Sequence, residues 1–270
     1  MGTRRLENKI AIVTGASRGV GRAVALALAR EGASVTLAAK TVEPHPKLPG
    51  TLGSVAAEIE ALGGKALMVQ TDVRDPEQID RMVAKTAEKF GRVDILVNNA
   101  GAAWWYGVPE TPANKWNLVN EVNGRATFLA SRAAFAEMKK NKFGHIVNMS
   151  PPIKPEMAEG KVAYMISKFA MTLCTIGMAP EFAHDNVAVH SLWPVTLIES
   201  YATINLGLGG PENWRKADIL ADATVALVTQ DPKATTGKAW IDEDVLRAAG
   251  VTDFAKYACV PGTTPMPIPW

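Results

Sequence analysis

The sequence predicts an α/β fold in which helices cover both faces of one doubly wound parallel sheet of about seven strands. Three observations support this prediction. Short apolar runs such as Ile10–Thr14 alternate with helical patterns of ten or more residues, and this alternation is typical of a parallel sheet. The 270 residues suffice for one large core. No repeat or linker divides them, so we expect a single domain over residues 1–270 with a proline-rich tail at 258–270.

The expected strands are the apolar runs that separate the helical patterns. They cover residues 10–14, 34–39, 66–71, 93–97 (followed by Asn98), 145–149 and 187–193, with a short last strand near 238–241. Helices are expected at residues 22–31, 52–62 and 76–90, in stretches up to about 141, around 164, and at about 212–228. Asp75 and Pro76 are suited to an N-cap and a first helical residue. The three prolines of residues 43–50 exclude a regular element there.

Composition argues against several classes of protein. The 29 basic and 27 acidic side chains leave a net charge of +2, so we expect no nucleic-acid partner and no membrane surface. We also expect no apolar run long enough to span a bilayer, and no signal segment precedes the first strand. Cys174 and Cys259 match no metal-ligand spacing and are too few for a disulfide framework. These features predict a cytoplasmic protein without a metal site.

A glycine-rich turn, Thr14–Gly21, follows the first strand. Its glycines at 15, 19 and 21 let the backbone turn tightly and approach a pyrophosphate at the N-terminus of the next helix. The spacing Gly-x3-Gly-x-Gly differs from that of the common dinucleotide fingerprint. Because the turn lies between a strand and an amphipathic helix, it still predicts a Rossmann-type nucleotide site.

The end of the second strand distinguishes NAD from NADP. The residues Ala38–Thr41 include no acid that could bind a ribose 2′-hydroxyl, whereas Lys40 is basic and Arg18 lies in the glycine turn. The two cations predict a 2′-phosphate and therefore NADP(H); the alternative for Lys40 is a solvated lysine at a strand end. Asp72, just past the third strand, could accept a hydrogen bond from the adenine amino group or form a turn.

Tyr164 and Lys168 lie one turn apart on the same face of a predicted helix. A cation there would favour the phenolate of a tyrosine whose free pKa is about 10, so Tyr164 could act as a general acid/base at neutral pH. On this pair alone, a tyrosine and a lysine on a half-exposed helix remain the alternative.

Together these residues resemble the short-chain dehydrogenase/reductase family over nearly the whole chain. The motifs TGASRGVG at 14–21, Asp72, Asn98-Asn99-Ala100-Gly101, Asn123 and Tyr164-x3-Lys168 occur in the family's order and at its spacing. The likeness is closer still to the hydroxysteroid dehydrogenase-like 2 branch, in segments such as AAKTVEPHPKLPGT at 38–51 and LWPVT at 192–196.

The resemblance implies hydride transfer between NADP(H) and a carbonyl or alcohol, and it implies a homodimer or homotetramer. Tyr164 would donate or accept the proton. Lys168 would bind the nicotinamide ribose and lower the pKa of Tyr164, while Asn123 would hold a water in a proton relay. The implied cofactor-binding residues are Gly15, Ser17, Arg18, Gly19, Val20, Gly21, Lys40, Asp72, Val73, Asn98, Ala100, Gly101, Tyr164 and Lys168, with Pro194 to Thr196 or Ser200 over the carboxamide.

The sequence departs from the family at one catalytic position. Family members carry a serine thirteen residues before the tyrosine, where this chain has Pro151, which lacks a hydroxyl and an N–H. Ser150 would face away if the strand runs straight, because side chains alternate. A twist forced by Pro151 and Pro152 would instead make Ser150 a catalytic residue. Since losing one oxyanion donor costs on the order of a hundredfold to a thousandfold in rate, an NADP(H)-binding sensor or scaffold with little turnover is the alternative function.

Two largely apolar segments, Ala102–Tyr106 and Tyr201–Gly210, follow the fourth and sixth strands. Parallel sheets of this kind bind ligands beyond the carboxyl ends of their strands. The predicted substrate is therefore an apolar carbonyl or alcohol. The alternative for Trp104 and Trp105 is that they pack a loop or a subunit contact.

Overall fold

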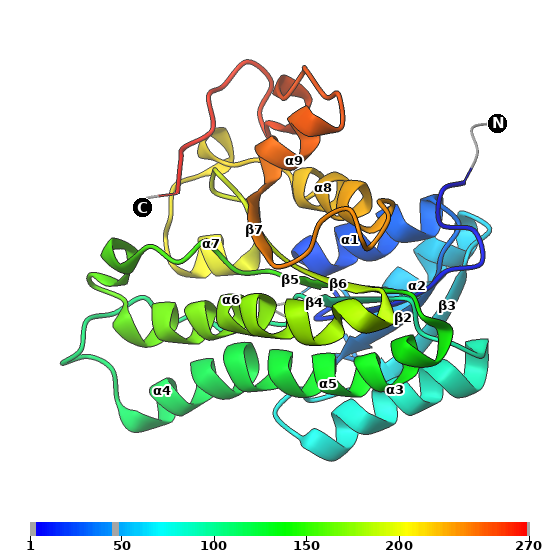
Figure 1. The fold of residues 1–270 in the computed structure, drawn as a ribbon. Helices are drawn as coiled ribbons and strands as arrows, with labels where there is room; N and C mark the ends of the chain where they lie inside the picture. Colours follow the sequence, from blue (N-terminus) through cyan, green and yellow to red (C-terminus); the bar gives the residue numbers. More distant parts are fainter. Residues whose placement is uncertain (1–3, 45–48, 269–270) are drawn as a thin grey trace.

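The computed structural model describes residues 4–44 and 49–268. Residues 45–48 of the proline-rich segment and the last two of the predicted tail lie outside this part. The sheet contains β1 (Ile10–Thr14), β2 (Ser34–Ala39), β3 (Lys65–Gln70), β4 (Ile95–Asn98), β5 (Gly144–Asn148), β6 (Val187–Trp193) and β7 (Lys238–Ile241). All neighbouring strands are parallel, in the order β3-β2-β1-β4-β5-β6-β7 (Figure 1). The predicted α/β sheet is confirmed.

The helices are α1 (Gly19–Arg30), α2 (Leu52–Ala61), α3 (Pro76–Phe90), α4 (Ala113–Val119), α5 (Ala126–Met138), α6 (Val162–Phe182), α7 (Tyr201–Asn205), α8 (Asp218–Val228) and α9 (Asp242–Ala248). Between α4 and α5 lies the π-helical segment η1 (Asn120–Arg125). One apolar layer joins the sheet to α1, α2, α8 and α9, and a second joins it to α3, α5 and α6. Figure 1 shows these layers on opposite faces of the sheet.

Three helix predictions need correction. The helix expected from about residue 212 begins at Asp218, because Pro211–Asn213 form a separate 3-10 turn and Arg215 is held in bridges to Ile198 and Ala258. The helices α7 and α9 were missed, because five and seven residues are too few to show a helical period. The three acidic residues in the first turn of α9 are a signal that could have located it.

The strand order reverses between β1 and β4, and this reversal positions the site. The connection after β1 leads into α1 on one face, while the chain after β4 leads towards α5 on the other. Because all carboxyl ends of the strands lie at one edge, these two connections diverge and leave a crevice between them. The glycine turn and residues 99–106 therefore form opposite sides of the same opening.

One segment corrects the expectation about membrane-spanning length. Among the described residues, Val162–Asp185 (α6 and the turn after it) is long and apolar enough to cross a membrane, judged by length and composition alone. In the fold, 56% of its most apolar window is buried inside the protein. A core helix of a globular protein passes the same test, and α6 packs on β5, β6 and α5.

Two histidines in the sheet predict how stability depends on pH. His145 of β5 and His190 of β6 are buried, with ring centroids 6.0 Å apart. Burial lowers the pKa of His145 to about 4 and that of His190 to about 3. In the unfolded chain both titrate near pH 6.5. As pH falls from about 6.5 towards 4, the unfolded state therefore binds more protons, and stability falls by up to about 1.4 kcal/mol per pH unit for each histidine.

We expect His190→Gln to make the free energy of unfolding less dependent on pH in this window, by about one proton. Urea denaturation at pH 6.5, 5.5 and 4.5 measures the slope, and the exposed His184→Gln is the matched control. The difference between the two variants in the slope of unfolding free energy against pH separates the contribution of His190 from that of carboxylates that titrate in the same range. An unchanged slope in His190→Gln would contradict the assignment of a buried neutral imidazole.

Candidate active site

The glycine turn connects β1 directly to α1. Gly15 and Gly19 have φ of +67° and +53°, in the left-handed region that favours glycine. A Cβ atom on Gly21 would lie 2.2 Å from the Gly15 carbonyl oxygen, so α1 starts in contact with the turn. The N-cap Arg18 makes no side-chain hydrogen bond to the helix, because a guanidinium has no acceptor. The N–H groups of the first turn therefore stay open to an anion.

The end of the proline-rich loop packs against this turn and holds Arg18. The Arg18 guanidinium donates from Nε to the Pro49 carbonyl and from Nη2 to the Gly50 carbonyl, both at 3.1 Å. Gly50 has φ of +90°, and a Cβ atom there would lie 2.4 Å from the Ser17 carbonyl oxygen. Exposed Lys40, after β2, lines the same cavity as Arg18. Both predicted cations thus lie at the glycine-turn end of the site.

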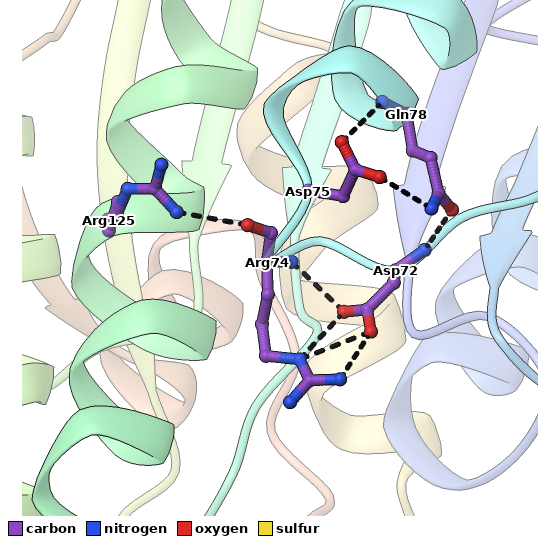
Figure 2. A network of polar contacts seen from close by, with 5 residues as sticks. All are labelled: Asp72, Arg74, Asp75, Gln78 and Arg125. Carbon is purple, nitrogen blue, oxygen red and sulfur yellow. Dashed lines mark hydrogen bonds and ion pairs between the residues drawn. The ribbon is translucent and has the colours of Figure 1, made fainter.

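Asp72 lies in a polar network at the end of β3 (Figure 2). Its carboxylate accepts from Arg74, with Nη2 to Oδ2 at 2.6 Å, and its backbone N–H donates to Gln78 at 2.9 Å. Hydrogen bonding from Arg74 lowers the pKa of Asp72. Figure 2 shows Arg125 reaching across from η1 to the Arg74 carbonyl, a bond of 2.9 Å. Asp72 lines the cavity as predicted, so an adenine amino group there would share this carboxylate with Arg74.

The segment after β4 corrects one cofactor-binding prediction. The Asn98 side chain faces the core, where Nδ2 donates to Ser131 and Asn148 at 3.0 and 2.8 Å, and it does not line the cavity. Asn99 lines it instead and donates from Nδ2 to the Thr14 carbonyl at 2.9 Å. Successive residues at a strand end point to opposite sides. That alternation is the signal by which Asn99 could have been chosen.

A cavity of about 530 Å³ extends from the glycine turn to α6. Its wall includes the predicted cofactor residues Gly15, Ser17, Arg18, Gly19, Val20, Gly21, Lys40, Asp72, Val73, Ala100, Gly101, Tyr164, Lys168 and Pro194. Asn98, Asn123, Ser150 and Thr196 do not line it. The fold therefore gathers residues from position 15 to position 194 around one space of the size typical for a small-molecule site.

Tyr164 and Lys168 lie on the cavity face of α6. Lys168 Nζ is 6.0 Å from the centre of the Tyr164 ring and donates to the Met149 carbonyl at 2.8 Å. The alternative of a half-exposed pair is wrong, because Tyr164 is 7% and Lys168 is 6% exposed. The helix thus presents a phenol and an amine together to whatever fills the cavity.

Burial decides the protonation of both groups. It raises the pKa of Tyr164 above its usual value, whereas the resemblance implied that Lys168 lowers it. Burial also lowers the pKa of Lys168 to about 8. The ammonium binds the Met149 carbonyl rather than the phenol, so desolvation dominates over charge attraction. Tyr164 is therefore protonated at neutral pH, which is the form of a proton donor.

A family model described as short chain dehydrogenase matches residues 9–202. The chain belongs to the short-chain dehydrogenase family. It is 46% identical to hydroxysteroid dehydrogenase-like protein 2 of Bos taurus over 268 residues, which cover 98% of this chain and 64% of the relative. The chain thus spans less than two thirds of that relative's length.

Solved structures of the short-chain dehydrogenase family share the fold. A short chain dehydrogenase from Mycobacterium thermoresistibile is 39% identical with a TM-score of 0.91, covering 98% of this chain and 95% of that one. A metagenomic short-chain oxidoreductase solved in complex with NADP is 29% identical with a TM-score of 0.75, covering 88% and 97%. The resemblance read from the motifs, including the hydroxysteroid dehydrogenase-like branch, is confirmed.

Asn123, the asparagine of the short-chain dehydrogenase motif, lies in η1, and its side chain has a structural role. It is fully buried, and its side chain bonds the backbone N–H and carbonyl of Ala102, each at 2.9 Å, and Ser167 Oγ at 2.8 Å. These bonds tie the segment after β4 to α6. Both amide hydrogens are therefore in use, and holding a relay water remains a prediction for Asn123. A π-helical turn inside an α-helix is frequent at functional sites.

Ser150 does not take the place of the family's serine. Its Oγ lies 2.9 Å from both Ser191 Oγ and Thr172 Oγ1, and the residue is fully buried away from the cavity. The Ser150 N–H donates to the Asn148 carbonyl at 2.8 Å in a turn just after β5, and its side chain faces away from the cavity, so the prediction of Ser150 as a catalytic residue is wrong. Thr172 Oγ1 also donates to the Pro151 carbonyl at 2.7 Å, which holds the two residues in this orientation.

The family segment after β6 forms another part of the wall. Pro194 lines the cavity, whereas Thr196 is buried outside it, and the cofactor role of Thr196 stays a prediction. Thr196 pairs with Pro267 in an antiparallel bridge, which turns its side chain into the protein. Ser200 lines the cavity, and its Oγ accepts from the Thr203 N–H as the N-cap of α7.

The two neighbouring tryptophans have different roles. Trp104 Nε1 donates to Thr111 Oγ1 at 3.2 Å within its own loop, as the packing alternative predicted. Trp105 lines the cavity with its ring centroid 5.7 Å from that of Tyr164. Trp193, which its place in a strand predicts to be a core residue, also lines the cavity. The sequence carried no signal that separates these tryptophans, because their orientation depends on the path of the loop.

Proposed function

We propose that this protein is an NADP(H)-dependent oxidoreductase that transfers hydride between the nicotinamide and an apolar carbonyl or alcohol, with Tyr164 as general acid/base. The observation that carries the proposal is the single cavity that joins the glycine turn and two cations at one end to Tyr164 and Lys168 at the other. Membership of the short-chain dehydrogenase family supports nicotinamide chemistry in that cavity.

The cofactor end fits a phosphorylated dinucleotide. The glycine turn leaves space where a Cβ would overlap the backbone, and such space allows a pyrophosphate to approach. Arg18 and Lys40 would face the 2′-phosphate, as Arg and Lys do at other phosphates. NADP bound to one structural relative supports the same choice here. When bound, the nicotinamide supplies or accepts the hydride.

The chain's own residues would handle the proton. Tyr164, protonated at neutral pH because it is buried, is suited to give its proton to a carbonyl oxygen as the carbonyl carbon gains hydride. Lys168, 6.0 Å from the Tyr164 ring, would stabilise the phenolate that remains. Apolar wall residues, among them Ala103, Leu118 and Met149, support an apolar substrate.

The test is to titrate NADPH and NADH and then to assay NADPH oxidation against a panel of apolar aldehydes and ketones. Tight NADPH binding with Tyr164-dependent turnover is the expected result. The second candidate, an NADP(H)-binding sensor or scaffold, is favoured by the burial of Ser150 next to Pro151. Binding without Tyr164-dependent turnover would support that candidate, and a preference for NADH would contradict the roles given to Arg18 and Lys40.

Lys40→Ala is expected to raise the Kd for NADPH about tenfold and to leave the Kd for NADH within about twofold. A charged hydrogen bond contributes about 1.5–3 kcal/mol and part of it is recovered by water, so a loss of about 1.4 kcal/mol, or tenfold, is reasonable. Quenching of protein fluorescence measures both constants. Lys65→Ala, an exposed lysine at the start of β3, is the control. Equal losses for both cofactors would contradict a 2′-phosphate at Lys40.

We also propose a homodimer or homotetramer located in the cytoplasm. Exposed apolar side chains on α5 and α6, including Phe128, Leu173 and Ile176, support self-association through these helices. Free thiols at Cys174 and Cys259 support a reducing compartment.

A further inference from the structure

The position of the reacting oxygen beside Tyr164 needs a second hydrogen-bond donor. As a carbonyl gains hydride its oxygen becomes negative, and donors placed there in advance lower the barrier. The serine that the family uses is replaced by Pro151, and the Ser150 hydroxyl is bonded to Ser191 and Thr172 in the interior. The donor must therefore come from another residue of the cavity wall.

Several polar groups of the wall are already engaged. The Ser200 hydroxyl lies 3.1 Å from Thr203 Oγ1, which itself donates to the Ile198 carbonyl at 2.8 Å. Asn99 donates to the Thr14 carbonyl. Lys168 Nζ donates to the Met149 carbonyl at 2.8 Å. These bonds hold the loops and helices around the cavity together, so using them for a substrate would break contacts of the fold.

Trp105 is different. Its Nε1 atom is buried and forms no hydrogen bond with any residue that the structure describes. The Trp105 ring lies against that of Tyr164, with the centroids 5.7 Å apart, and the indole opposes the rise in the tyrosine's pKa. A buried donor without an acceptor costs about 1–3 kcal/mol, and a buried indole N–H usually has a partner. This N–H therefore points to an acceptor that arrives with a ligand.

Neighbouring residues fix the Trp105 ring in place. Lys161 Nζ lies 4.9 Å from the centre of the ring, on its face. The ring also packs with Met157, Tyr164 and Phe169 in a small apolar cluster. A donor held this firmly loses little freedom when a substrate binds, which is what preorganised stabilisation of a negative oxygen requires.

Trp193 is the other cavity tryptophan whose buried Nε1 forms no hydrogen bond within the described part of the chain. Lys168 Nζ lies over its ring, 5.4 Å from the centroid. A lysine thus lies over the face of each ring, and what distinguishes Trp105 is that its ring packs against that of Tyr164, with the centroids 5.7 Å apart. The geometry favours Trp105 as the donor.

We propose that the Trp105 Nε1–H group donates the second hydrogen bond to the substrate oxygen, beside the Tyr164 hydroxyl, in the place of the family's serine. The inference rests on the proposed function. The indole keeps its proton throughout: the oxygen receives the proton of Tyr164, and Trp105 stabilises the negative charge that develops before that transfer. The site thereby retains two donors although Pro151 occupies the serine position.

The kinetic test is Trp105→Phe, which keeps an aromatic ring and removes the N–H. With NADPH and the apolar carbonyl that the wild type reduces best, decanal being one probe of the panel, kcat/KM is expected to fall about a hundredfold. The Kd for NADPH should stay within about twofold. Trp104→Phe is the matched control, because that indole donates to Thr111 within its loop, and it should keep wild-type kcat/KM.

A shape-matched replacement separates hydrogen bonding from packing. Incorporating 3-benzothienylalanine at position 105 puts sulfur in the place of the N–H with little change in volume, and the same loss is expected. A second readout does not depend on turnover. In the NMR spectrum of the protein with NADP⁺, the indole N–H resonance absent from Trp105→Phe should move downfield when a ketone binds, and the Trp104 resonance should not.

The possible outcomes separate this inference from the proposed function. Full activity in Trp105→Phe together with an inactive Tyr164→Phe would overturn the role of Trp105 and leave the oxidoreductase intact. Wild-type activity in the benzothienyl variant would overturn it as well, because the effect would then be one of shape. Absence of turnover by the wild type on the whole carbonyl panel would overturn the proposed function, and the role of Trp105 with it.

Discussion

Tyr164→Phe is expected to lower kcat for carbonyl reduction by on the order of a thousandfold, because general acid catalysis contributes about a hundredfold to ten-thousandfold. The Tyr164 hydroxyl is the proton donor that the cavity presents next to Lys168, and phenylalanine keeps the ring while it removes that proton. The Kd for NADPH should change by less than about twofold, since the ring remains in place. Steady-state oxidation of NADPH with the best apolar carbonyl measures the effect.

The matched control is Tyr106→Phe, which removes the hydroxyl of an exposed tyrosine in the loop after β4. It should keep wild-type kcat. The pH profile adds a further check on the pair: burial lowers the pKa of Lys168 to about 8, so wild-type reduction should weaken above about pH 8 as the ammonium loses its charge. Retention of more than about a tenth of the activity in Tyr164→Phe would show that another group supplies the proton.

Gly21→Ala is expected to raise the Kd for NADPH by about a hundredfold or more and to destabilise the protein by about 3 kcal/mol, the upper end for overpacking. The new Cβ atom would lie 2.2 Å from the Gly15 carbonyl oxygen and 2.5 Å from Asn99 Nδ2. The first of these is a backbone atom, so no side-chain rotation relieves the overlap. Either α1 or the turn must move, and both hold the predicted pyrophosphate position.

Fluorescence titration with NADPH and urea denaturation measure the two effects separately. Gly53→Ala in α2 is the control, because its added Cβ would have its nearest described neighbour, Thr51 Oγ1, at an ordinary 3.7 Å. That variant should bind NADPH like the wild type and unfold within about 1 kcal/mol of it. If Gly21→Ala binds NADPH normally, the close approach of α1 to the turn has no part in cofactor binding.

Local patterns predicted most of the fold. The strands β1, β2 and β6 have the predicted bounds, and α3 begins at Pro76 behind the Asp75 cap. Each of these elements is long enough to show the repeat of its strand or helix, and α3 also carries a capping signal at its start. The conformation that the local sequence favours is therefore the one that burial in the fold requires. The missed helices, α7 and α9, have five and seven residues, and their conformation depends on contacts made by their ends.

The site was predictable where a residue type is required by backbone geometry. Gly15 and Gly21 are needed because nothing larger fits, and Tyr164 and Lys168 share a helix face because of their spacing. The predicted residues Asn98, Ser150 and Thr196 do not line the cavity. Each sits at the end of a strand or just beyond it, where one residue of offset moves a side chain from the cavity to the core.

The sequence by itself determined the parallel sheet, the glycine turn, the family and the pair Tyr164 and Lys168, because all four depend on spacing along the chain. Only the tertiary structure decided that burial raises the pKa of Tyr164, that Ser150 turns inward to Ser191, and that Trp105 rather than Trp104 reaches the cavity. The physical reason is that desolvation and side-chain direction depend on neighbours that are distant in sequence. No local pattern of residues encodes those neighbours.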